Sequence, residues 1–65
     1  MKKAIGLTFR HRIHLRQMGG LWLPEARAWL IPAVSVANAA MLPGIVLVDP
    51  DEAEIATFYT TQLPR

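Results

Sequence analysis

The chain has no cysteine, so neither a disulfide bridge nor a thiolate metal site can stabilise it. Its 65 residues provide for one domain, and a domain of this size buries only about 60% of the surface that its unfolded chain exposes. Stability must therefore come from apolar packing within one chain or between chains. We expect an oligomer or a complex with a partner.

Charged residues are missing from the middle of the sequence. Residues 28–48 hold no Asp, Glu, Lys or Arg, whereas residues 1–27 hold six of the seven cations and residues 49–65 four of the five acids. Two interpretations suit a soluble protein: a basic module for polyanions with an acidic tail for another partner, or two halves that neutralise each other in the fold.

A third interpretation places the uncharged stretch in a membrane, as a single-span accessory subunit of a larger complex. The stretch is long enough to cross a bilayer, has Trp29 at one end and separates a basic from an acidic side. Pro32, Asn38 and the pair Pro43–Gly44 interrupt it, however, and a lone helix in lipid could not satisfy the carbonyls that they free. We prefer a cytoplasmic protein, since residues 1–8 are too short for a signal peptide and basic residues follow them.

Alternation with a period of two marks the first part of the chain. Odd positions from Ile5 to Leu15 are apolar except His11, and this pattern predicts a strand over residues 2–16, continuous or bent near Arg10, with the apolar side chains inward. The opposite face would be a basic ribbon able to follow phosphates or enter a major groove. Arg27 lies outside this segment and is added as a further cation. The predicted DNA-binding residues are thus Arg10, Arg12, His14, Arg16 and Arg27.

Turn and helix signals divide the rest of the chain. Gly19–Gly20 predicts a turn, Pro24 opens a short helix over 25–30, and residues 34–36 and 45–48 form a strand hairpin around a loop. Asp49 and Pro50 predict the start of a helix with Ile55, Phe58, Tyr59 and Gln62 on one face. A strand over 55–61 is the alternative, because that segment is rich in β-branched and aromatic residues.

No residue pattern indicates catalysis. His11 and His14 would point to opposite faces of a strand, and Ser35 stands between valines, outside any nucleophile motif. We therefore expect no enzyme, no metal site and no cofactor. Trp22 and Trp29 are assigned to the core or to an interface, and stacking platforms for bases are the alternative. Phe58, Tyr59 and Leu63 are the predicted anchors for a protein partner of the tail, unless the tail packs on its own sheet.

The segment Met18-Gly19-Gly20-Leu21-Trp22-Leu23-Pro24 resembles the loop and strand signature of AbrB-type and MazE-type swapped-hairpin domains. Gly20-Leu21-Trp22-Leu23 is similar to a motif of the SymE-type toxins, which share that fold. The resemblance continues in Val34, Val36, Gly44 and the apolar run 45–48, and covers about residues 4–48. The helix after Pro24 is shorter than in that family, the hairpin loop is longer, and Gly20 replaces a residue that is often basic.

The resemblance implies a mainly β fold with short helices, in which the hairpins of two chains intertwine into a β-barrel homodimer. It also implies an acidic segment, residues 49–65, appended to a domain of residues 1–48. The leading hypothesis is a dimeric DNA-binding transcription regulator or antitoxin-like repressor. A SymE-like toxin and a small inhibitor that masks a protein surface are alternatives.

Overall fold

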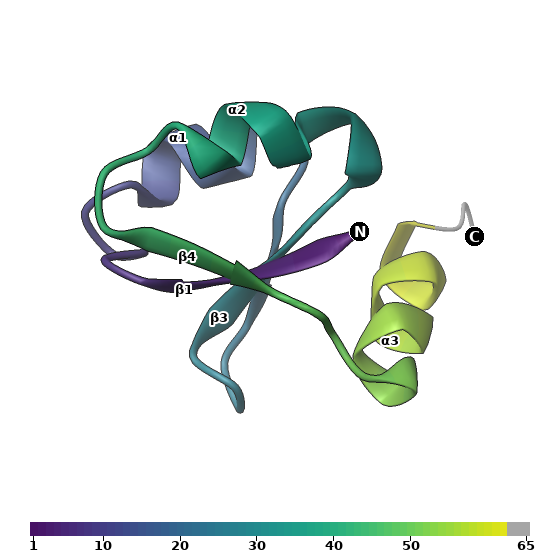
Figure 1. The fold of residues 1–65 in the computed structure, drawn as a ribbon. Coiled ribbons are helices and arrows are strands. Elements are labelled where there is room, and N and C mark those ends of the chain that lie inside the picture. Colours follow the sequence, from purple (N-terminus) through teal and green to yellow (C-terminus); the bar gives the residue numbers. More distant parts are fainter. Residues whose placement is uncertain (63–65) are drawn as a thin grey trace.

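Four antiparallel strands and three helices make up the computed structural model, which describes residues 1–62 (Figure 1). The strands are β1 (Lys2–Gly6), β2 (Leu21–Leu23), β3 (Ala28–Ile31) and β4 (Ile45–Val48). The helices are α1 (Arg12–Gln17), α2 (Val36–Ala40), which follows a 3₁₀ turn at Ala33–Ser35, and α3 (Glu52–Gln62). The strand order is β2-β3-β1-β4, so the first six elements follow the split βαβ arrangement and α3 is added to it.

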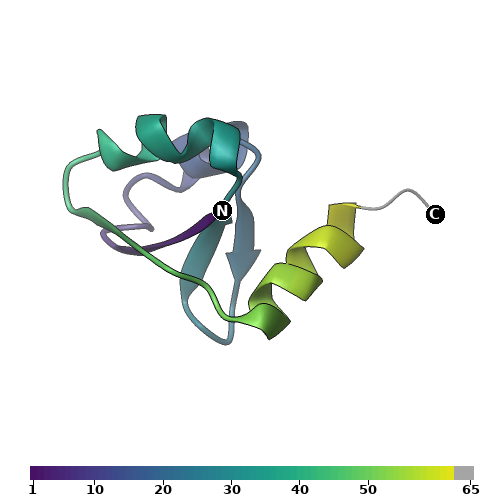
Figure 2. The same ribbon diagram turned by 45° about the vertical axis from the view of Figure 1, so that its right-hand side comes forward.

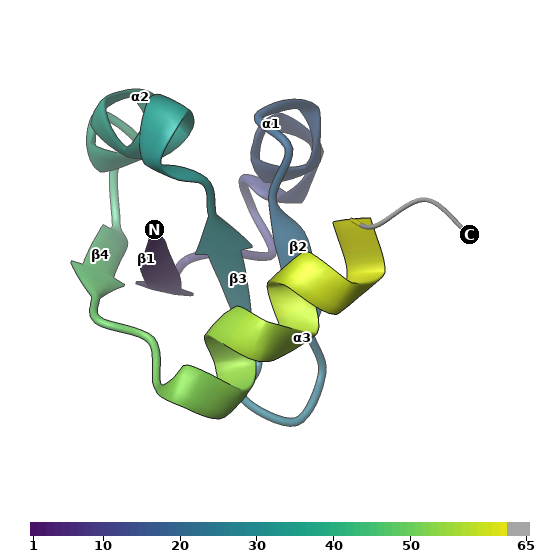
Figure 3. The same cartoon turned by 90° about the vertical axis from the view of Figure 1, so that its right-hand side faces the viewer.

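Helices cover both faces of the sheet (Figure 3). On one face, Leu15 of α1 and Ala39 of α2 pack with Ala4, Trp29 and Ile31. On the other face, Phe58 of α3 packs with Leu23 and Leu30. Strand β3 is buried at all four positions because it lies in the interior of the sheet and under helices on both sides.

The predicted strand over residues 2–16 is wrong beyond Gly6. Strand β1 ends there at φ +96°, and a Cβ at this position would lie 2.3 Å from the Gly44 carbonyl oxygen. Residues 7–11 then form a turn and α1 follows. The alternation fails because β3 pairs with β1 only as far as Ala4 and β4 only as far as Gly6, so no strand is available to pair with a longer β1. Leu15 is buried as expected, but Leu7, Phe9 and Ile13 are exposed.

Two further segments differ from the prediction, and two predicted features are confirmed. Residues 24–27 form the turn between β2 and β3 and residues 28–31 a strand, instead of the helix expected over 25–30. Residues 34–36 are helical, so no hairpin joins them to β4, which pairs with β1. The turn at Gly19 and the strand over 45–48 are confirmed.

The expected sheet and short helices are present, but the sheet is open, with β2 and β4 at its edges. Closure of the sheet into a barrel and exchange of hairpins between two chains stay predictions. Within residues 1–62, no helix combines the length and the apolar character needed to cross a bilayer.

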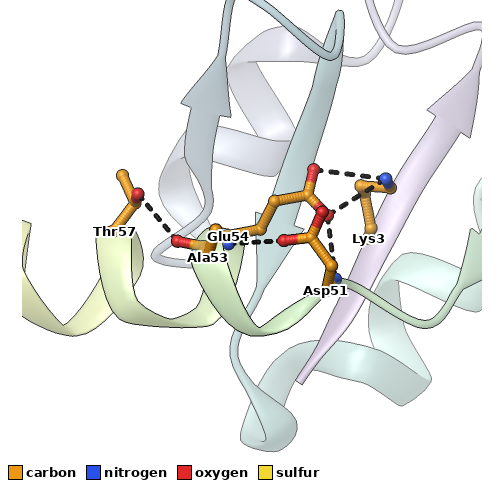
Figure 4. Close-up of polar contacts among 5 residues, drawn as sticks. All are labelled: Lys3, Asp51, Ala53, Glu54 and Thr57. Carbon is orange, nitrogen blue, oxygen red and sulfur yellow. Dashed lines mark hydrogen bonds and ion pairs between the residues drawn. The ribbon is translucent and has the colours of Figure 1, made fainter.

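A reciprocal capping box starts α3, two residues later than predicted. The Glu54 backbone N–H donates to Asp51 Oδ1 (2.7 Å), and the Asp51 N–H donates to Glu54 Oε1 (2.9 Å). The same Glu54 carboxylate accepts from Lys3 Nζ of β1, at 3.2 Å to each oxygen (Figure 4). This half-buried ion pair and the packing of Phe58 place the segment after residue 48 against the sheet of its own chain.

A second ion pair, between Lys2 and Asp49, predicts a pH dependence. The Lys2 ammonium donates a hydrogen bond to Asp49 Oδ1 and, with its positive charge, lowers the pKa of that carboxyl below 3.8. The contribution to stability is thus complete above the unfolded pKa and is lost as the pH falls through the lower folded pKa. Carboxyl ¹³C shifts should show Asp49 titrating below 3.8, and Lys2→Met should bring its midpoint back toward 3.8. An unchanged midpoint in Lys2→Met would contradict this assignment.

Candidate nucleic-acid interface

Two arginines of α1 lie on one side of that helix. Arg12 and Arg16 are four residues apart, a spacing that places side chains on the same helix face. Leu15 lies between these arginines in the sequence. It is fully buried and packs α1 against the sheet. Arg12 Nη1 donates to the Phe9 carbonyl oxygen (2.8 Å), and its guanidinium carbon lies 4.1 Å from the centre of the Phe9 ring. The preceding turn therefore holds Arg12 against an exposed aromatic ring.

Two tryptophans extend this surface across the sheet. Trp22 and Trp29 are paired residues of β2 and β3, and their ring centres are 5.5 Å apart at an interplanar angle of 53°. Trp29 is buried, whereas Trp22 is 42% and Phe9 76% exposed. We call Phe9, Arg12, Arg16 and Trp22 the arginine–aromatic patch. These four residues line a surface hollow of about 330 Å³ together with Thr8 and Trp29.

The arginines of the patch are not neutralised by acidic residues. The ion pairs found in the described part of the chain join Lys2 to Asp49 and Lys3 to Glu54, and both connect β1 to the acidic segment. No Asp or Glu lines the hollow at the patch or the adjoining one beside Ile13 and Gln17. The acidic half thus neutralises the lysines of the basic half and leaves the positive charge of α1 available to an anion.

Only Arg12 and Arg16 of the predicted DNA-binding set come together. Arg10 is exposed in the turn before α1 and lines neither hollow. His14 lies beside His11 (ring centres 6.4 Å apart), which donates from Nε2 to the Pro43 carbonyl oxygen at 2.8 Å. Arg27 is in the turn between β2 and β3, at the end of that hairpin away from α1 (Figure 1).

The aromatic members of the patch differ from the prediction, which has Phe9 inward on a strand and Trp22 in a core or an interface. The signal for Phe9 was its position directly before the basic run, because residues this close in the sequence stay near the arginines whether the segment is a strand or a helix. Trp22 could not be added from sequence, because its place in the same hollow as Arg12 and Arg16 depends on how the hairpin β2–β3 packs.

The predicted anchors of the tail lie in different environments. Phe58 is buried on Leu23 and Leu30, so it contributes to the core of its own chain and not to an exposed anchor. Tyr59 is 59% exposed and contacts the Phe58 ring edge to face, at 5.8 Å between ring centres. Leu63 lies outside the described residues.

A larger hollow, of about 490 Å³, lies between the β2–β3 turn and the start of α3. Its lining includes Glu25, Asp51 and Glu54 and no cation, so it does not suit a polyanion. Among residues 1–62 no three His, Cys, Asp or Glu side chains are grouped so as to hold a metal ion. The arginine–aromatic patch is therefore the candidate site.

Comparisons of the chain with protein-family models, with curated proteins and with solved structures gave no match. The relation to the AbrB-type and MazE-type domains accordingly stays a prediction from the motif at 18–24.

Proposed function

We propose that this protein binds single-stranded DNA through the arginine–aromatic patch. The observation that supports the proposal most is the placement of two unneutralised arginines beside two exposed aromatic rings. Sites for single strands combine these features: cations follow the phosphates, and bases stack on aromatic faces. A role as a transcription regulator or an antitoxin-like repressor remains a prediction of the resemblance alone.

The patch suits an unpaired strand better than a duplex groove. Helix α1 has six residues, about 9 Å of helix, and its Leu15 face is packed on the sheet. The extended basic ribbon that would enter a major groove is absent, because residues 12–17 are helical. Trp22 and Phe9 instead offer ring faces, and stacking of one base on such a ring contributes about 1–3 kcal/mol.

The test measures binding by the fluorescence anisotropy of a labelled oligonucleotide, as a single strand and as the duplex of the same sequence. We expect tighter binding of the single strand. If Arg12 and Arg16 each neutralise one phosphate, the logarithm of affinity should fall with the logarithm of salt with a slope of about −1.4. Trp22 fluorescence should also change on stacking, since that ring is partly exposed.

Two double variants with equal changes in net charge separate the patch from general electrostatics. Arg12→Ala with Arg16→Ala should weaken binding at least about tenfold, because the complex loses one charge-assisted contact to a phosphate at each substitution. Arg10→Ala with Arg27→Ala removes the same charge outside the patch and should weaken it much less. An equal loss in both variants, or tighter binding of the duplex, would contradict the proposal.

A further inference from the structure

Strand β4 is an edge strand with an unpaired side. It pairs with β1 along one side, and no strand within residues 1–62 pairs with the other (Figure 3). All four of its residues, Ile45-Val46-Leu47-Val48, are apolar. An exposed apolar edge of this kind is a template for pairing with another strand.

The hydrogen bonding to β1 identifies the free backbone groups. The Leu7 N–H donates to the Gly44 carbonyl oxygen (3.0 Å), and this pair continues the β1–β4 register. Because hydrogen-bonded and non-hydrogen-bonded pairs alternate in an antiparallel ladder, Val46 and Val48 point their backbone groups toward β1. Leu47 therefore directs its N–H and C=O outward. At Ile45 only the C=O remains, since its N–H donates to the Leu42 carbonyl oxygen (3.3 Å).

The two edges of the sheet differ in protection. Strand β2 has three residues, and the alternation of hydrogen-bonded pairs leaves Trp22 as its one residue with outward backbone groups. Pro24 follows the strand directly and has no N–H to donate. Strand β4 carries none of the features that usually prevent edge pairing, namely a charge, a proline or a bulge within the strand. The longer of the two edges is thus also the less protected one.

The segment that leads to this edge is uncharged and partly exposed. Helix α2 contacts β4, and residues 28–48 contain no charged side chain. Val34, Met41 and Val46 of this segment are 87%, 80% and 54% exposed. Absence of charge together with exposed apolar side chains is typical of the centre of a protein interface.

We propose that a second copy of this chain pairs with β4, antiparallel and centred on Leu47, to form one eight-stranded sheet. Leu47 would exchange both backbone hydrogen bonds with Leu47 of the second copy, and each Asp49 N–H would donate to the Ile45 carbonyl of the other chain. The Asp49 N–H makes no backbone hydrogen bond within residues 1–62. This register uses every outward group identified above.

Side chains and charges are compatible with that two-fold arrangement. Val46 lies opposite Val48 of the second copy in a non-hydrogen-bonded pair, where Cβ atoms approach to about 4.5–5.5 Å. The two Asp49 residues are four strand positions apart, about 14 Å, so their repulsion is largely screened at physiological salt. Because the same strand supplies both sides, the contact closes on itself and leaves no free edge at β4.

Light scattering of the intact chain tests the association. The wild-type protein should be a dimer, and Val46→Lys should raise its dissociation constant at least about tenfold, because each dimer would bury two lysines against valine. Tyr59→Lys is the matched control, since Tyr59 is 59% exposed on α3, away from the edge. This variant should remain dimeric, and circular dichroism should show both variants folded. A monomeric wild type, or a dimer unaffected by Val46→Lys, would overturn the proposal.

Disulfide trapping tests the register, and the absence of natural cysteine makes it specific. Val46→Cys and Val48→Cys proteins, mixed and oxidised, should form mainly the mixed 46–48 dimer, because only that pair lies directly opposite. Preferential linkage of 46 to 46, or of 48 to 48, would overturn the register centred on Leu47. Tyr59→Cys should give no comparable product.

Discussion

Replacing Leu30 by alanine should lower the free energy of unfolding by about 2–5 kcal/mol, the range for truncating a buried leucine. Leu30 is fully buried in β3 and packs with Leu23 and Phe58 beneath α3. A domain of this size has a total stability of roughly 3–10 kcal/mol, so the substitution removes a large fraction of it. The cavity would lie directly under Phe58, and we expect α3 to lose its packing first.

Urea unfolding followed by circular dichroism measures this loss. Ile13→Ala is the control, because Ile13 is 63% exposed on α1 and its truncation should change stability by less than about 0.5 kcal/mol. A Leu30→Ala protein as stable as the control would show that the cluster beneath α3 contributes little to folding.

The second large loss of stability is expected for Gly6→Ala, at the end of β1. Ala at this position would have φ near +96° and would place its Cβ 2.3 Å from the Gly44 carbonyl oxygen. The nearest obstacle is backbone, so β1 and the loop before β4 would have to separate. This cost adds to the roughly 1 kcal/mol or more for a left-handed conformation in a non-glycine residue.

Gly19→Ala separates these two costs. Gly19 also has a positive φ of +83°, but the nearest atom to an added Cβ is the Pro32 Cγ at 3.6 Å, an ordinary contact. Thermal unfolding should therefore show a moderate loss for Gly19→Ala and a clearly larger one for Gly6→Ala. Equal losses would mean that the close approach of Gly6 to Gly44 does not constrain the fold.

Local chemistry made some elements predictable. The turn at Gly19, the apolar strand at 45–48 and a capped helix after residue 49 follow from glycine, β-branched and acidic residues whose preferences act over a few neighbours. Sequence could not distinguish a helix cap at Asp51 from one at Asp49, because both aspartates have an acidic residue three positions further on. Glu54 was selected by its additional contact with Lys3 of β1.

Periodicity misled where the sheet offered no partner. Residues 7–16 alternate as a strand would, yet β1 is limited by the length of β3 and β4, and the chain turns at Gly6. Residues 28–31 carry no alternation because α3 covers one face and α1 with α2 the other. In both segments the pattern depends on packing that a short window of sequence does not contain.

The amino-acid sequence is sufficient to predict the unequal distribution of charge, the uncharged middle, the lack of cysteine and the local starts and stops of several elements. The folded arrangement is needed to see that the acidic segment neutralises Lys2 and Lys3 while Arg12 and Arg16 remain available beside Trp22. These contacts could not be predicted because they join residues far apart in the chain. Their geometry is fixed by the strand order β2-β3-β1-β4 and not by local preference.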